Sequence, residues 1–185
     1  MTSAPVEVVE GQWRAAVVTG IPHWQFEPVG WFSETDSAAA EAPPTPRSAV
    51  VELRRSGGGL MPWALVGGHY GPDESDLLRV RVGHTGQLYG TPDHDCVGIL
   101  GRPLATGLPE EFAQATVNGL IRFEPALNRP GLLTVLAGAF DQADSSEYAF
   151  ERASALLKWA LLGPSSGASI SDRSLAEFLR SHMGK

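Results

Sequence analysis

The chain has 185 residues, which is enough for one well-buried domain and too few for two complete ones. Its 43% hydrophobic content supports a packed core and excludes global disorder. A formal net charge of −7 argues against a sequence-independent grip on nucleic acid, which requires a basic surface. A single cysteine, Cys96, excludes an internal disulfide. Neither a secretory signal nor an apolar run of about 20 residues is visible. We therefore expect a cytoplasmic protein without a membrane segment.

The first third of the chain predicts an arm and a linker. Residues 5–20 contain strand-forming valines punctuated by glycines, which predicts one or two strands. Four aromatic residues follow between prolines: Trp24, Phe26, Trp31 and Phe32. We interpret them as a clasp that folds back over the core, and the alternative is an apolar groove that binds a partner. Residues 33–48 are small, polar and proline-rich, so the prediction is an N-terminal arm over 1–32 and a flexible linker over 33–48.

A run of strands precedes any helix. Four segments are predicted as strands, at 48–56, 62–68, 77–83 and 96–100. The third has a clean period of two, with Leu78, Val80 and Val82 on one face and Arg79 and Arg81 on the other. Strands followed by helices favour an antiparallel sheet and the α+β class.

Two helices flank a buried strand in the second half. Residues 108–123 predict a helix with acidic residues in its first turn, and 132–140 predict a strand. The second helix is expected to have Asp144 as its N-cap, with Glu147 completing a capping pair and Ser145 as the alternative cap, and to end at Gly163. The core domain is therefore expected over 49–163, and 164–185 is expected to be a tail with a short helix.

Two segments carry a likeness to a known family. TGLPEEFAQATVNGL at 106–120 and GAFDQADSSEYAFERASAL at 138–156 resemble domain IV of elongation factor G and its translational GTPase relatives. The direct matches in the second block are Asp144, Ser145, Ser146, Glu147, Ala149 and Phe150. The resemblance implies the ribosomal protein S5 domain 2-like fold, with about four strands and two helices on one face, here extended by the N-terminal arm and the C-terminal helix.

The resemblance also points to a tip loop, at Phe140, Asp141 and Gln142. In the family this loop carries a histidine and enters the decoding region of the ribosome. Here that position is Asp141, and RNA phosphates would repel an acidic tip. No GxxxxGK[ST] motif occurs, so we expect no GTP binding.

Other candidate sites carry weak signals. Arg54, Arg55, Arg79 and Arg81 form a possible basic stripe for RNA or an acidic protein, and the alternative is that they are solvated strand positions. The segment PDHDC at 92–96 places possible metal ligands side by side, and His69 and His84 could join them. Adjacent strand residues point to opposite faces and no CxxC or HxxxH spacing is present, so we assign no metal, cofactor or catalytic set.

These observations favour a stand-alone, non-enzymatic binding domain whose partner is an unidentified protein. The alternatives are a translation-linked factor that binds the ribosome or RNA, and a small enzyme that uses the histidine-bearing loops at 69–96. A monomer and a strand-swapped homodimer remain equally open.

Overall fold

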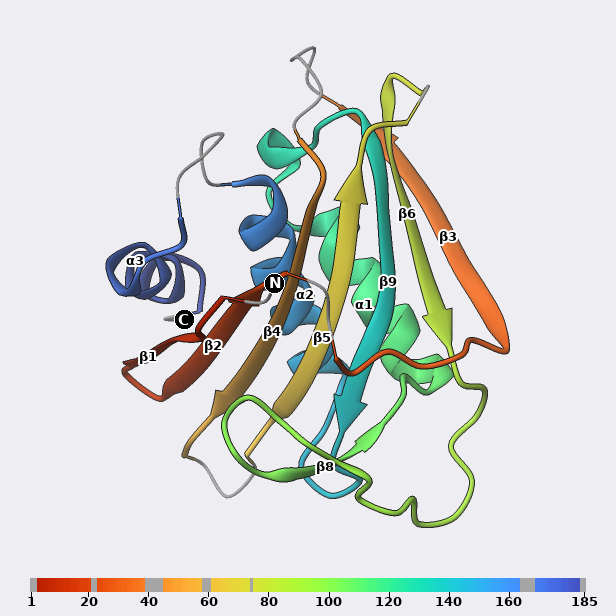
Figure 1. The fold of residues 1–185 in the computed structure, drawn as a ribbon, viewed down its shortest axis with the longest axis vertical. Helices are drawn as coiled ribbons and strands as arrows, with labels where there is room; N and C mark the ends of the chain where they lie inside the picture. The colour runs from red at the N-terminus through yellow and green to blue at the C-terminus, as the bar shows by residue number, and fades with distance from the viewer. Residues whose placement is uncertain are drawn as a thin grey trace.

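The computed structural model describes residues 3–20, 23–38, 45–57, 61–73, 75–163 and 169–183. These residues form one mixed sheet of nine strands and three α-helices (Figure 1). The strands are β1 (Val6–Glu10), β2 (Trp13–Thr19), β3 (Gly30–Ser37), β4 (Arg47–Arg55), β5 (Trp63–Gly71), β6 (Leu77–His84), β7 (Cys96–Val97), β8 (Pro103–Thr106) and β9 (Gly131–Phe140). The helices are α1 (Glu110–Arg122), α2 (Glu147–Leu162) and α3 (Asp172–His182), with a short 3-10 helix at Pro125–Leu127.

The main path of the sheet runs β1-β2-β4-β5-β9-β6-β3. Its neighbouring strands are antiparallel except β6 and β9, which are parallel. The β7–β8 hairpin joins this path through β8, which pairs with the last two residues of β9. The central position of β9 therefore links the first half of the chain to the second.

The expected fold, an S5 domain 2-like sheet of about four strands with two helices, is wrong. The described residues form a sheet of nine strands and three α-helices. The reason is that segments expected to lie outside the core continue its sheet on both sides: β2 pairs with β4, and β3 pairs with β6. Residues 33–37, expected in the linker, belong to β3, whereas residues 39–44 of that linker lie outside the described residues.

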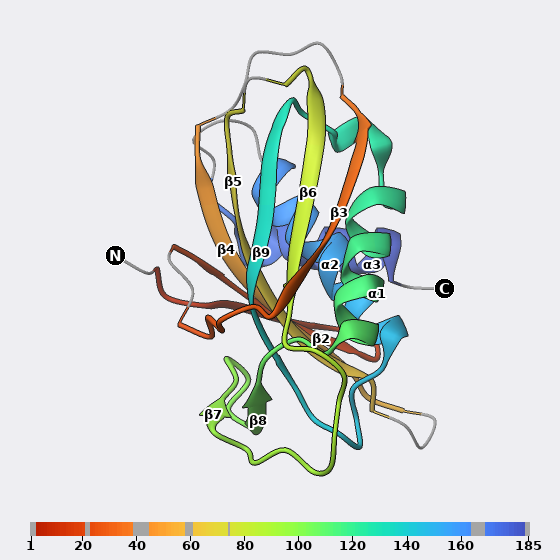
Figure 2. The ribbon, with the colours of Figure 1, turned by 90° about the vertical axis from the view of Figure 1, so that its right-hand side faces the viewer.

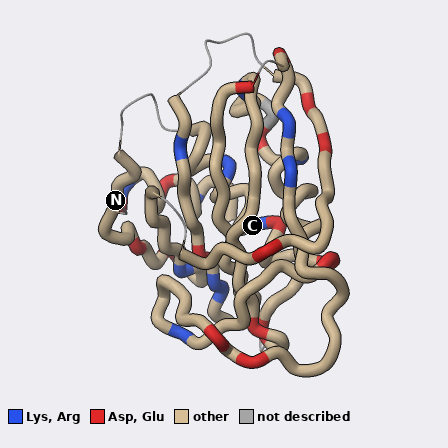
Figure 3. Tube along the Cα trace, turned by 45° about the vertical axis from the view of Figure 1, so that its right-hand side comes forward, with Lys and Arg blue, Asp and Glu red and all other residues tan. Residues whose placement is uncertain are grey.

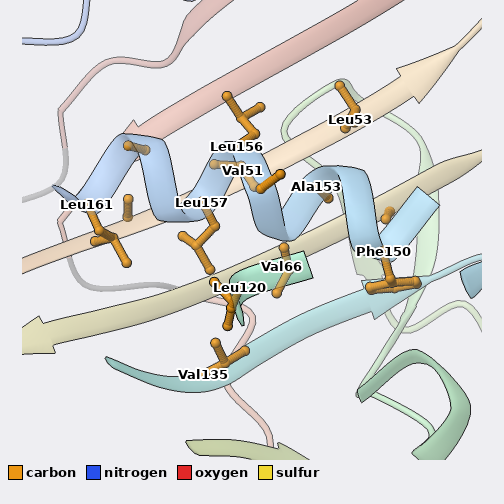
Figure 4. Packing of buried hydrophobic residues seen from close by; sticks show 14 of the residues in the cluster. Val51, Leu53, Val66, Leu120, Val135, Phe150, Ala153, Leu156, Leu157 and Leu161 are labelled. Atoms are coloured by element: carbon orange, nitrogen blue, oxygen red, sulfur yellow. The ribbon is translucent and has the colours of Figure 1, made fainter. Parts of the chain in front are cut away.

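All three helices lie on one side of the sheet (Figure 2). Helix α2 places its apolar side chains against β4, β5 and β9, with Phe150 and Leu157 among the fully buried residues (Figure 4). Helix α1 crosses α2 closely at Gly119, where any Cβ would collide with the backbone carbonyl of Glu151. The absence of a side chain at Gly119 therefore permits the close contact between the two helices.

Helix α3 covers the β1 end of the sheet. It starts with a capping box in which the Ser171 and Ser174 side chains bond to each other's backbone N–H. At its other end the Trp13 indole donates to the Met183 carbonyl at 2.7 Å, and Arg180 makes a bidentate pair with Glu10. Within the described ranges, none of the helices combines the length and apolarity that crossing a membrane requires.

The face opposite the helices is crossed by residues 23–29, which we call the strap. In Figure 1 the strap is the red-to-orange chain that passes in front of β5, β9 and β6 before β3. Phe26 donates its backbone N–H to Leu136, and the Trp24 indole donates to the Val97 carbonyl of the hairpin. Trp24, Phe26 and Phe32 pack against the apolar clusters, as the clasp interpretation predicted, but Trp31 is 37% exposed.

Candidate functional site

The strap and the β7–β8 hairpin cover only part of the face that the helices leave open. The hairpin closes over an apolar cluster that includes Trp63, Leu104 and Ala139. The strap separates the hairpin from the rest of this face. On the side of the strap away from the hairpin, no described element covers β5 and β9 (Figure 1). We call this uncovered part the open face.

A row of polar side chains crosses the open face, one from each of five strands. The strand registers place Ser48 opposite His69, His69 opposite Thr134, Thr134 opposite Arg81, and Arg81 opposite Ser33. Their neighbours along the strands, such as Tyr70, Val80, Val82 and Leu133, point into the core beneath the helices. We call these five residues the cross-strand row.

The cross-strand row is rich in donors and contains no carboxylate. Ser48 Oγ lies 3.0 Å from Nδ1 of His69. The Arg81 guanidinium stands over the Trp31 ring, 4.3 Å from its centroid. Among the described residues, nothing forms a hydrogen bond or ion pair with Arg81, whereas its neighbour Arg79 is paired with Asp73 at 2.9 Å.

The floor beside His69 is hollow. Gly67 and Gly71 stand two positions before and after His69 on the same face of β5, so the ring has no side-chain neighbour along its own strand. The hollow has a volume of about 350 Å³ and is lined by Gln25, Ser48, Gly67, Gly68, His69, Thr134 and Leu136. At Gly67 a Cβ would lie 2.8 Å from Val50 Cγ2, so packing of the sheet also requires this glycine.

Both ends of the sheet are edge strands. Strand β1 pairs with β2 and packs against α3, whereas β3 pairs with β6 and packs against α1, and none of the described residues forms a strand on the outer side of β3. Its register with β6 is continuous from Gly30 to Ser37, without a bulge. At its last residue, Asn128 donates to the Ser37 carbonyl and to the Asp36 carboxylate. The free edge is therefore the stretch from Gly30 to Asp36.

The four arginines proposed as a basic stripe do not gather on one surface. Arg54 and Arg55 point to opposite faces of β4, where their guanidinium groups stand over Trp63 and Trp13, respectively. Arg79 and Arg81 lie together on β6, which is separated from β4 by the two strands β5 and β9. Figure 3 shows basic positions scattered over the molecule among acidic ones.

The predicted tip residues are engaged within the protein. Phe140 is buried and contacts Phe112 edge-on. Asp141 accepts hydrogen bonds from the N–H groups of Ala143 and Asp144 and lies 3.4 Å from His94, while Gln142 donates to the Gly90 carbonyl. The turn is thus held against the 84–96 loop.

The start of α2 requires a correction. The N-cap is Ser146, whose Oγ accepts from Ala149 N–H, and not Asp144; Glu147 is the first helical residue. The reason is that residues before Ser146 are used by the turn: Trp63 N–H donates to the Asp144 carbonyl, and Ser145 Oγ donates to the Trp63 carbonyl. Asp144 fixes the turn, and the helix starts three residues later, at Glu147.

The histidines of the 69–96 region lie in different surroundings. His69 belongs to the cross-strand row, and His94 approaches Asp141. His84 stacks on Phe32 and lies 3.8 Å from Glu110. No group of three or more potential metal ligands occurs within the described part of the chain, and burial raises the pKa of the Cys96 thiol, which disfavours a reactive thiolate.

Two buried charged residues escaped the sequence analysis. Glu52 lies beneath the hairpin, accepts from the Trp63 indole at 2.6 Å and from Leu100 N–H at 2.8 Å, and burial raises the pKa of its carboxyl. Lys158 of α2 is fully buried and donates to the Phe123 carbonyl, the residue after α1. Burial lowers the pKa of the Lys158 amine to about 8. The sequence did not indicate that Glu52 and Lys158 are buried, because charged residues in strands and helices are usually exposed.

Comparison with known proteins does not identify the chain. No family model matches it, and neither the curated proteins nor the solved structures compared with it give a match. The resemblance to elongation factor G domain IV therefore stays a prediction.

Proposed function

We propose that this chain is a non-enzymatic binding domain, and that it binds a protein partner by adding an extended segment of the partner to the free edge of β3. The observation that carries the proposal is the length and regularity of the β3 edge, which runs for eight residues without a bulge, whereas the other terminal strand, β1, has five residues. A regular edge strand presents a row of unpaired backbone N–H and C=O groups to an incoming strand. Proteins usually protect such an edge with Lys, Pro or a bulge, and β3 contains none of them.

Exposed apolar side chains lie along the same edge. Val29 just before β3 is 73% exposed, Trp31 is 37% exposed, and Leu77, which pairs with the last residue of β3, is 44% exposed. Aromatic residues are enriched among the residues that dominate the affinity of protein interfaces. Trp31 is moreover held in place by Arg81, so its ring presents a fixed contact surface.

Charge favours a different protein over a second copy as the partner. In an antiparallel β3–β3 pair centred on Glu34, the two carboxylates would lie opposite each other. Centring the pair on Ser33 or Phe32 places Glu34 opposite Phe32 or Gly30, neither of which neutralises it. We therefore propose a partner segment that carries a basic residue opposite Glu34 and apolar residues near Trp31.

The test uses Glu34→Lys with Glu177→Lys, a matched substitution on α3, as the control. Partners captured on the wild-type protein are purified, and their affinities are measured by calorimetry. We expect Glu34→Lys to weaken binding about tenfold or more, because it replaces an attractive pair with a repulsive one, whereas Glu177→Lys should bind like the wild type. In the complex, hydrogen exchange should slow at β3 amides; equal affinity of both variants, or protection confined to another element, would refute the proposal.

The translation-linked alternative requires the arginines to converge near the 140–144 loop, and this condition is not met. Co-sedimentation with ribosomes at physiological salt measures ribosome binding directly. We expect no binding, because the formal net charge of the chain is −7. We also propose a cytoplasmic location, since the sole cysteine of these 185 residues cannot form a disulfide within them.

A further inference from the structure

We propose that the cross-strand row is a second binding site, which takes a small molecule carrying a carboxylate or phosphate group. The site lies on the sheet face and not along its edge, and it shares Trp31 and Ser33 with the β3 edge strand. Neighbouring strands lie about 4.8 Å apart, so the row of five residues extends over roughly 19 Å. That length accommodates an anionic head group at one end and the body of a small molecule beside it.

Arg81 is the centre of the proposed head-group site. Its guanidinium is stacked on Trp31, which fixes its plane while leaving N–H groups at its edge available. Within the part of the chain that the structure describes, no acceptor occupies these N–H groups. A planar guanidinium with unoccupied donors matches the two oxygens of a carboxylate or phosphate.

Neighbouring hydroxyl groups complete the head-group site. Thr134 and Ser33 flank Arg81 on the adjacent strands β9 and β3, and Ser33 lines the same surface depression as Arg81. Both hydroxyls can donate to an anion. No Asp or Glu belongs to the row, and the nearest carboxylate that an ion pair identifies, Asp73, is bound to Arg79. The row itself therefore carries the positive charge of Arg81 and no negative charge, which favours an anionic ligand, while Glu34 of β3 lines the same surface depression as Arg81.

The hollow beside His69 suits the body of the ligand. Its volume of about 350 Å³ falls in the range of small-molecule sites. Leu136 and the glycine floor offer apolar contact, and Gln25 of the strap lies at its rim. Ser48 bonds to Nδ1 of His69, and the other ring nitrogen, Nε2, lies beside Gly71. Thr134 lies in both the row and the hollow lining, so it joins the two parts of the site.

The test is a titration of ¹⁵N-labelled protein with inorganic phosphate and, separately, with acetate, each compared with sodium chloride at equal ionic strength and pH. We expect saturable shifts of the Arg81 Nε–H signal and of the His69 and Thr134 amides. Phosphate and acetate differ in the head group, so the probe that saturates at lower concentration identifies the ligand class. Arg173→Gln, a change at an exposed arginine on α3, is the control and should titrate like the wild type.

Arg81→Gln should weaken the saturable shifts about tenfold or more, because a charge-assisted pair is lost. Thr134→Val keeps the shape of the side chain and removes only its hydroxyl, so it should also weaken the saturable shifts. If Arg81→Gln perturbs the sheet, Thr134→Val serves as the test of the site. Shifts no larger than those produced by chloride, or saturable shifts that neither variant weakens, would overturn the proposal. Neither result bears on Glu34, so failure of this site is distinguishable from failure of partner binding at β3.

Discussion

Replacing Lys158 by methionine should change the pH dependence of stability in a defined window. Lys158 is fully buried, and burial lowers its pKa from 10.5 to about 8, against the opposing influence of Asp36 and Glu124. The unfolded chain therefore binds a proton more tightly than the folded one between these two pH values. The free energy of unfolding consequently rises with pH from about 8 to about 10.5, and it is lowest below pH 8, where the folded protein holds a buried ammonium.

The magnitude follows from the size of the shift. A difference of one pKa unit corresponds to about 1.4 kcal/mol, so the Lys158 contribution changes by about 3 kcal/mol across the window. Lys158→Met preserves the length of the buried side chain but leaves the Phe123 carbonyl without its donor, which costs about 1–3 kcal/mol at every pH. The free energy of unfolding of the variant should therefore be close to that of the wild type near pH 7, and it should become lower than that of the wild type as the pH rises.

Urea unfolding followed by tryptophan fluorescence at several pH values from 7 to 11 measures this difference. Subtracting the curve of the variant from that of the wild type removes the contributions of tyrosines and other groups that titrate in the same range. Arg173→Met, which removes a 90% exposed side chain on α3, is the control. Its difference from the wild type in the free energy of unfolding should not change with pH. Parallel wild-type and Lys158→Met curves would refute the assignment of a buried, largely neutral amine near pH 9.

Two further substitutions test the packing that positions the site. Gly119→Ala should destabilise the protein by about 2 kcal/mol or more in urea unfolding, because its Cβ would collide with the Glu151 carbonyl; an unchanged or increased stability would contradict the close helix crossing. Glu52→Ala should cost about 3 kcal/mol, because it leaves the Trp63 indole and the Leu100 N–H without their acceptor, and a loss below 1 kcal/mol would mean that water or another group replaces the carboxylate.

The sequence predicted those elements whose periodicity or caps are strong. The alternation in 77–83 assigned Leu78, Val80 and Val82 to the buried face and the arginines to the other, and this prediction is confirmed. Both long helices and the C-terminal helix are also confirmed, with boundaries correct to within about three residues. In these segments the local pattern and the tertiary environment agree, so local reasoning is sufficient.

The edge strand β3 could not be predicted from its composition. Ser33–Ser37 contains only small or polar residues, which are typical of a linker. These residues form a strand because the backbone of β6 provides hydrogen-bond partners, and an edge strand needs one such partner and little burial. The number of strands was wrong for the same reason: pairing with a distant strand leaves almost no trace in the sequence of the paired segment.

The cross-strand row illustrates a second limit. Each of its members lies in a separate strand, and the alignment of His69 with Thr134 depends on a register shift between Gly67 and Gly68. Without that shift the β5 residues beyond it would move by one position relative to β9, and His69 would no longer lie opposite Thr134. The same irregularity that is invisible in the sequence thus places the imidazole, the hydroxyl and the Arg81 guanidinium in one line. A surface that requires four strand registers to agree is a property of the fold, and no contiguous motif in the sequence could have indicated it.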